Sequence, residues 1–199
     1  MRVACLGGGP AGLYFAISMK LRDPGHEVVV FERNKPDDTF GWGVVLSDET
    51  LNNLAENDAK SAEAIRGHFS YWDDVAVLYR GEKTVSTGHG FCGIGRKQLL
   101  ILLQQRAREL GVELRFETEA ESAAHYAKEF DLVVASDGLN SKTRTEFADK
   151  FQPYRLGTGR RMAPTAETSK IARRNQARNG SNGLECRSFV FAESHVFRY

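Results

Sequence analysis

A glycine-rich turn near the N-terminus constrains the fold of this 199-residue chain more than any other feature. Residues 7–12 read GGGPAG, which has the spacing G-x-G-x-x-G, and they follow the β-branched and apolar run Arg2–Leu6 directly. The apolar residues of Pro10–Leu21 then recur with helical spacing, so the glycines open a helix. A strand, a glycine turn and a helix in this order predict a βαβ unit that binds a dinucleotide.

The glycines of this turn have separate predicted tasks. Gly7 permits the tight turn, Gly9 lets a pyrophosphate approach the backbone, and Gly12 lets the helix pack close to the strand. Pro10 suits a first helical turn because the N–H that it lacks has no partner there anyway. The helix N-terminus then offers free N–H groups and the positive end of its dipole to phosphates.

An acidic residue follows the second predicted strand at the distance that a nucleotide site requires. The run Val28–Phe31 is apolar at every position, which is typical of a buried parallel strand. Glu32 comes directly after it, 20 residues beyond Gly12. A carboxylate there accepts hydrogen bonds from ribose hydroxyls and repels a 2′-phosphate. Glu32 therefore favours dinucleotide binding over the alternative of an ordinary glycine-rich turn.

The later elements indicate an α/β fold. Ser47 is a candidate cap for a helix beginning at Asp48. The further predicted elements are a hairpin of Asp74–Tyr79 and Lys83–Thr87, a helix Gln98–Leu110 ended by Gly111, and strands Val112–Phe116 and Leu132–Ala135. This order predicts a Rossmann-like domain with a parallel sheet and a small antiparallel insertion.

Composition excludes several classes of partner and site. The chain has 27 Lys and Arg against 26 Asp and Glu, and this balance gives no electrostatic footprint for nucleic acid. No apolar run is long enough for a transmembrane helix, and the apolar stretch at the N-terminus is too short for a signal peptide. Cys5, Cys92 and Cys186 lack metal-binding or redox spacing, so we expect a reduced, cytoplasmic protein without a metal.

Charge divides the chain unevenly. Residues 1–154 carry 18 basic and 23 acidic side chains, whereas residues 155–199 carry 9 and 3. Residues 155–187 are also poor in large apolar side chains, which predicts a disordered or aberrant segment. The alternative is a basic tail that binds an anionic partner. We therefore divide the chain into domain 1–154, segment 155–187, and a residual strand within 188–199.

Three further segments carry a resemblance to a known family. Residues 40–47 read FGWGVVLS, residues 86–96 read STGHGFCGIGR, and residues 131–144 read DLVVASDGLNSKTR. Together with the glycine turn, they resemble the FAD-dependent aromatic-ring hydroxylases of the p-hydroxybenzoate hydroxylase class, over about Met1 to Tyr154. The GWGVVL stretch is most similar to the branch of salicylyl-CoA and anthraniloyl-CoA hydroxylases and the tryptophan hydroxylase of violacein synthesis.

This resemblance implies a flavoprotein monooxygenase. The family uses FAD, NADH or NADPH, and O₂ to hydroxylate an aromatic acid or its CoA thioester, and the cofactor supplies the difficult chemistry. No catalytic side chain and no oligomeric state follow from the resemblance. The cofactor-binding residues that it implies are Gly7, Gly9, Pro10, Ala11, Gly12, Glu32, Arg33, Gly43, Val44, Arg96, Asp137 and Gly138.

Alternative interpretations stay open at several of these positions. Arg96 is either a cofactor ligand or an ordinary first-turn residue of a helix. Asp137 either contributes to the cofactor site or caps the turn that follows it. Trp42, between two glycines, is expected to pack, and His89 is expected to be structural or exposed rather than to face the flavin.

The chain departs from the family after Tyr154. The family continues there with strands of a substrate-binding sheet and a Gly-Asp motif, and this sequence contains no Gly-Asp dipeptide. We therefore expect the N-terminal part of the catalytic domain, with an inherited cofactor site. Two alternatives to a monooxygenase remain, a non-catalytic dinucleotide-binding remnant and another FAD-dependent oxidoreductase of the same fold.

Overall fold

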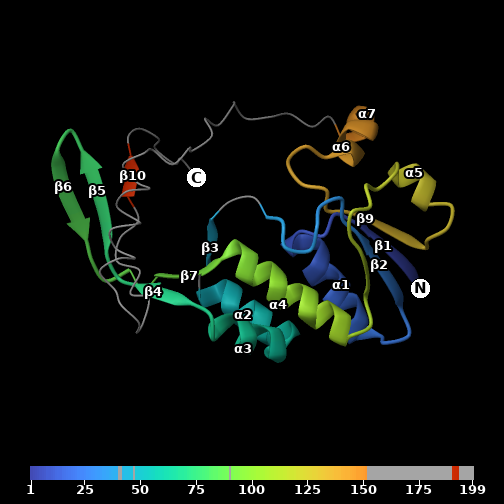
Figure 1. Cartoon of the computed structure of the whole chain (residues 1–199), viewed down its shortest axis with the longest axis horizontal. Helices are drawn as coiled ribbons and strands as arrows, with labels where there is room; N and C mark the ends of the chain where they lie inside the picture. Colours follow the sequence, from blue (N-terminus) through green and yellow to red (C-terminus); the bar gives the residue numbers. More distant parts are fainter. Residues whose placement is uncertain (40–41, 47, 90, 152–189, 193–199) are drawn as a thin grey trace. The chain divides into compact units, whose positions relative to one another are not determined.

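The chain divides into two compact units, whose helices and strands are labelled in Figure 1. The computed structural model describes residues 1–39, 42–46, 48–89, 91–151 and 190–192. Unit 1 holds the described residues up to His68 and those from Ile94 onward to 151. Unit 2 holds the described residues from Phe69 to Gly93 together with 190–192. The predicted segment 155–187 lies outside the described residues.

A four-stranded parallel sheet forms the centre of unit 1. Its strands are β1 (Arg2–Leu6), β2 (Glu27–Phe31), β8 (Glu113–Arg115) and β9 (Leu132–Ala135). The order is β8-β2-β1-β9, and each neighbouring pair is parallel. The predicted α/β fold with a parallel sheet is confirmed.

Helices and one further strand complete unit 1. They are α1 (Pro10–Arg22), β3 (Gly43–Leu46), α2 (Asp48–Asn57), α3 (Ala59–Arg66), α4 (Arg96–Glu109), α5 (Ala123–Tyr126), α6 (Lys142–Glu146) and α7 (Ala148–Phe151). The helix expected at Asp48 begins there, while its candidate cap Ser47 lies outside the described residues. Helix α4 begins two residues earlier than predicted, because the extended backbone ends at Gly95. It ends at Glu109, one residue before the predicted Leu110, and Gly111 follows with φ +78°.

Side chains of the central strands alternate between two covered faces. Ala4 and Leu6 of β1 point with Val29 and Phe31 of β2 into a cluster that Tyr126 of α5 completes. The other residues of these strands point to the opposite face, where α1 packs against both strands and against α4. Both faces are therefore buried, as the apolar run of the second strand predicted.

Unit 2 is antiparallel apart from one edge strand. Its strands are β4 (Ser70–Trp72), β5 (Val75–Tyr79), β6 (Glu82–Ser86), β10 (Val190–Ala192) and β7 (Phe91–Gly95), whose last two residues belong to unit 1. Strands β5 and β6 pair antiparallel, and so do β4 and β7, whereas β10 runs parallel to β5. The predicted hairpin is confirmed. Its two-residue turn has Arg80 at φ +49° and Gly81 at φ +88°, the backbone that favours tight hairpins.

Among the helices of the described residues, none has both the length and the apolar character needed to cross a bilayer.

Candidate functional site

The glycine turn after β1 is closed by very near approaches of the backbone. Gly7 has φ +111°, and a Cβ atom there would lie 2.4 Å from the Ser136 carbonyl oxygen. A Cβ atom at Gly12 would lie 2.1 Å from the Gly7 carbonyl oxygen. Any larger residue at either position forces the backbone apart, so the predicted structural tasks of both glycines agree with the geometry.

Ser136 fastens this turn and was not singled out by the sequence. Its hydroxyl donates to the carbonyl oxygens of Leu6 and Gly7, at 3.1 and 2.9 Å, and its N–H donates to Leu6 O at 2.8 Å. The signal that could have found it is its position directly after β9, the strand that pairs with β1. Ser136 thus joins the two carboxyl ends of neighbouring parallel strands, where α/β folds bind ligands.

The start of α1 is open where a phosphate would approach. A Cβ atom at Gly9 would have no other atom within 4 Å, in contrast to Gly7 and Gly12. Gly9 caps the helix, Pro10 follows it, and the first intrahelical bond runs from Leu13 N to Gly9 O at 3.0 Å. The N–H groups of Ala11 and Gly12 therefore have no acceptor within the helix, which is the arrangement that binds phosphates.

Glu32 is held rigidly at the end of β2. Its Oε2 accepts a hydrogen bond from Gly8 N at 2.8 Å, so the carboxylate is tied to the glycine turn. Its Oε1 accepts from both the backbone N–H and the side-chain amide of Asn34, at 2.8 and 2.7 Å. Asn34 was missed because its contribution is a local contact with Glu32 rather than part of a motif. Oε1 uses both of its lone pairs on Asn34, so Oε2 keeps one lone pair with which to accept a ligand hydroxyl.

These parts surround one small cavity of about 100 Å³ within unit 1. Its lining combines the glycine turn, the segment after β2 and the first turns of α4. The lining residues are Gly8, Gly9, Glu32, Asn34, Lys35, Pro36, Asp38, Thr39, Arg96, Leu100, Gln104 and Phe116.

Two polar atoms of this cavity are buried without a partner. Arg96 is the first residue of α4, and its backbone N–H donates to Trp42 O at 3.1 Å. Its Nε atom and the Thr39 Oγ1 atom are both buried and have no hydrogen bond within the described part of the chain. Buried polar atoms are nearly always paired, so these two indicate a group that the protein binds here.

The arrangement fits the ADP half of FAD. The N-terminus of α1 offers N–H donors and a positive dipole to the pyrophosphate. Glu32 offers its Oε2 as an acceptor for a ribose hydroxyl, and Arg96 offers a buried Nε donor with no partner among the described residues. The cavity therefore has an acceptor side and a donor side, which matches a ligand with hydroxyls at one end and phosphates at the other.

Asp137 and Gly138 adjoin the glycine turn but do not line this cavity. A Cβ atom at Gly7 would lie 3.0 Å from Asp137 N. The Asp137 carboxylate accepts from Thr143 N at 3.1 Å, so it caps the turn into α6. Burial opposes its ionisation, but the hydrogen bonds from Ser141 and Thr143 outweigh burial and lower the pKa of Asp137. Of its two interpretations, the structural one is directly observed.

The remaining predicted residues lie outside the cavity lining. Arg33 is exposed, and it assists Lys142 in lowering the pKa of Glu119. Gly43 approaches the backbone of β7, since its Cβ atom would lie 3.0 Å from Ile94 O, and Val44 is half-buried in β3.

Two aromatic side chains test the expectations on packing. Trp42 is 75% exposed, so the prediction that it packs is wrong. Its backbone is instead the anchored part, because the carbonyl oxygen accepts the Arg96 N–H. His89 of unit 2 is exposed, lies 2.7 Å from Ser86 Oγ through Nε2 and stacks on Phe91 at 5.3 Å between ring centroids. The expectation of a structural or exposed histidine agrees with this position.

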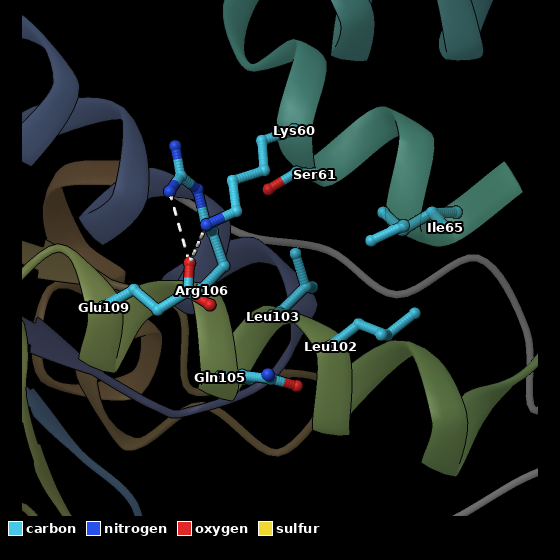
Figure 2. A pocket seen from close by; sticks show the side chains of 9 residues that line it. Lys60, Ser61, Ile65, Leu102, Leu103, Gln105, Arg106 and Glu109 are labelled. Atoms are coloured by element: carbon cyan, nitrogen blue, oxygen red, sulfur yellow. Dashed lines mark hydrogen bonds and ion pairs between the residues drawn. The ribbon is translucent and has the colours of Figure 1, made fainter. Parts of the chain in front are cut away.

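A second, larger cavity of about 150 Å³ lies between α3 and α4 (Figure 2). Nearby, the Asp58 carboxylate accepts from Arg106 Nε and Nη2 at 2.8 and 2.9 Å and from Ser61 Oγ at 2.6 Å. Glu109 accepts from Lys60 Nζ at 2.8 Å and from Arg106 Nη1 at 3.3 Å. Burial raises the pKa of Asp58, yet the Arg106 and Ser61 hydrogen bonds outweigh it and lower the pKa. These charged groups pair with one another, so they do not indicate a bound ligand.

Metal binding finds no support in the part of the chain that the structure describes. Within residues 1–39, 42–46, 48–89, 91–151 and 190–192, no three His, Cys, Asp or Glu side chains gather into a possible metal site.

Known proteins resemble about three quarters of this chain. Salicyloyl-CoA 5-hydroxylase of a Streptomyces species is 51% identical over 153 residues, which are 77% of this chain and 29% of that protein. A 3-hydroxy-4-methyl-anthranilyl-(aryl-carrier protein) 5-monooxygenase of Streptosporangium sibiricum is 34% identical over 76% of this chain and 42% of its own length. A crystal structure of 2-methyl-3-hydroxypyridine-5-carboxylic acid oxygenase, in a mutant form, matches with a TM-score of 0.62 and 27% identity, over 73% of this chain and 42% of that one.

The chain thus spans less than half the length of these relatives. The resemblance to FAD-dependent aromatic hydroxylases is confirmed for the N-terminal part of such proteins. The family model described as FAD binding domain matches residues 1–145, which include the glycine turn, Glu32, Arg96 and Asp137. On this match over most of its length, the chain belongs to the family of FAD-binding domains.

Proposed function

We propose that this chain is the FAD-binding part of a flavoprotein monooxygenase that hydroxylates an aromatic acid or its CoA thioester, using NADH or NADPH and O₂. The observation that carries the proposal is the cavity between the glycine turn, Glu32 and Arg96, with its two unpaired buried polar atoms. Because the chain covers 29% of the Streptomyces hydroxylase, the activity is proposed for a protein in which this part is joined to a substrate-binding part.

Each cofactor-binding residue has a proposed task. Gly9 leaves room for the pyrophosphate, and the N–H groups of Ala11 and Gly12 after Pro10 donate to it. Glu32 accepts from the adenosine ribose, and Arg96 donates through Nε.

A second group of residues supports the site or extends it. Gly7 closes the turn. The residues proposed to contact FAD beyond the cavity are Arg33, Gly43, Val44, Asp137 and Gly138.

FAD, once bound, supplies the transfer of electrons from the nicotinamide and the activation of O₂. The protein residues described above hold its ADP half, and none of them takes part in bond formation. This division agrees with the family resemblance, from which no catalytic side chain follows.

The proposed substrate class comes from the relatives. One relative is named for salicyloyl-CoA and another for an anthranilyl group on an aryl-carrier protein, so both act on an aromatic acyl group joined to a carrier. The proposed location is the cytoplasm. Its support is the buried Cys5, which forms no disulfide within the described residues, as is usual in reducing compartments.

Cofactor binding can be tested first, and turnover second. The purified 199-residue chain should bind FAD with a visible flavin absorption band and a defined dissociation constant. In a protein in which this part is joined to a substrate-binding part, oxidation of NADH or NADPH that increases on addition of salicyloyl-CoA, with formation of a hydroxylated product, would support the full proposal. No binding of FAD at micromolar protein and cofactor would refute it.

A second candidate is a dinucleotide-binding protein without catalysis. The residues that line the cavity offer contacts to a cofactor, and none of them is assigned a catalytic role. Tight FAD binding without aryl-CoA-dependent NAD(P)H oxidation, in a protein that also has the substrate-binding part, would favour that candidate, whereas NAD(P)H oxidation with a different electron acceptor would indicate another FAD-dependent oxidoreductase.

A further inference from the structure

Thr39 is a polar residue of the cavity to which neither a motif nor the family resemblance gives a role. Its Oγ1 atom is buried and makes no hydrogen bond with the described residues. A buried hydroxyl without a partner is unfavourable, because it has lost its hydrogen bonds to water without replacing them. Such an atom in a cavity points to a ligand group that completes it.

The other lining residues identify which part of a cofactor faces Thr39. Gly8 and Gly9 belong to the phosphate-binding turn, and Glu32 is the residue placed for the ribose. Arg96, which supplies the other unpaired buried atom, lines the same cavity. All four are features of an ADP site, so the group that reaches Thr39 belongs to the ADP half of FAD rather than to the flavin ring.

The segment that carries Thr39 is fastened to the helix that carries Arg96. Gln104 of α4 donates from Nε2 to Pro36 O at 2.8 Å, and Asp38 N donates to Lys35 O at 3.1 Å. The side chain of Gln104 is buried, so this connection is shielded from solvent. Thr39 and Arg96 are therefore held in place together before a ligand arrives, which lowers the entropy lost on binding.

We propose that the Thr39 hydroxyl is a ligand of the ADP half of FAD, donating a hydrogen bond to one of its phosphate or ribose oxygens beside Arg96. This inference rests on the proposed function. It adds a specificity residue whose hydroxyl is needed by the cofactor and is not needed by the fold.

A matched pair of variants tests this role in the full 199-residue chain. Thr39→Val keeps the shape and removes the hydroxyl, while Thr39→Ser keeps the hydroxyl and removes a methyl group. Titration of FAD into each apoprotein, followed by flavin fluorescence, should show binding about tenfold weaker in Thr39→Val and within about twofold of the parent in Thr39→Ser. ADP used as a competitor should lose the same factor, because it carries the same half of the cofactor.

Stability of the apoprotein supplies a readout that a structural role would move differently. If the hydroxyl serves the cofactor, Thr39→Val apoprotein should unfold at the same or a slightly higher urea concentration than the parent. A Thr39→Val variant that is less stable but binds FAD as tightly as the parent would assign the hydroxyl to the fold, through a water in the cavity, and would overturn the inference. A parent chain that fails to bind FAD would instead refute the proposed function, and with it this role.

Discussion

The two cavities of unit 1 differ in how their polar groups are satisfied. In the cavity between α3 and α4, Arg106, Glu109 and Lys60 bond to one another or to Asp58. In the cavity beside the glycine turn, Arg96 Nε and Thr39 Oγ1 are buried without partners among the described residues. The first is the larger, yet only the second is incomplete without a ligand. Unpaired polar atoms therefore distinguish a binding site from a structural hollow better than volume does.

The ion pair of Asp58 and Arg106, beside the cavity between α3 and α4, should matter most for stability. Asp58 is 4% exposed at its side chain and Arg106 is 16% exposed, and two hydrogen bonds join them. Replacing Asp58 with Ala leaves the Arg106 charge buried, so we expect a loss of about 3 kcal/mol in the free energy of unfolding. Urea denaturation measures this loss, and FAD affinity of the folded fraction should stay within about twofold of the parent.

Lys60 supplies the control for that variant. Its side chain is 64% exposed, so its ion pair with Glu109 is expected to contribute little to stability. A similar loss in Lys60→Ala and Asp58→Ala would contradict the assignment of a buried structural pair to Asp58 and Arg106.

The cavity beside the glycine turn should matter most for binding of the cofactor. Because nothing lies within 4 Å of a Cβ atom at Gly9, Gly9→Val should fold normally but place its side chain where the pyrophosphate binds. We expect FAD binding to weaken by about 100-fold, which corresponds to about 2.7 kcal/mol. Gly12→Ala is the matched contrast, since its Cβ atom would lie 2.1 Å from Gly7 O and should lower stability first. Equal flavin content in Gly9→Val and the parent would remove Gly9 from the site.

Glu32 should have a smaller effect on the cofactor. Glu32→Ala removes hydrogen bonds to an uncharged ribose, which typically costs on the order of 1 kcal/mol, or about a fivefold weaker binding of FAD. It also releases Gly8 N and Asn34 from their shared acceptor. Glu32→Gln keeps an acceptor oxygen, so its dissociation constant for FAD should lie between those of the parent and Glu32→Ala. An unchanged dissociation constant in both variants would exclude Glu32 as a ribose ligand.

The smallest expected effect is a pH dependence of stability that arises from the Asp58 carboxylate. The pKa of Asp58 in the folded protein is below the ordinary value of 3.8. Its contribution to stability is therefore present above that value and is lost as the pH falls through the folded pKa. Unfolding measured from pH 6 down to pH 3 should show a steeper loss in the parent than in Asp58→Ala, and parallel curves would contradict this assignment.

The sequence predicted the elements whose signals are local. A few consecutive residues suffice to predict the glycine turn, the apolar run before Glu32 and the hairpin around Arg80 and Gly81. Helix α3 was missed because it spans only two turns, and β4 because three residues carry too little pattern. Trp42 was misjudged because a tryptophan between glycines says nothing about which way its ring points.

The site was predicted less completely than the fold. Glu32 and Arg96 follow from a motif and a resemblance, and the structure brings both to one cavity. Ser136 and Thr39 were missed for a physical reason, since the importance of each hydroxyl depends on burial and on neighbours that are distant in sequence. No pattern of nearby residues records such a contact.

The bond from Ser136 to Gly7 also has a consequence for how the protein is made. Its two residues are 129 positions apart, so the glycine turn emerges from the ribosome long before the residue that fastens it. At ordinary rates of synthesis this interval is on the order of 10 s. During it, β1, α1 and β2 can form a βαβ-like unit without the neighbour that fixes the turn. Capture of FAD by the nascent chain therefore awaits the emergence of β9, and a ribosome stalled before Ser136 would display a chain with its nucleotide motif present but not yet competent.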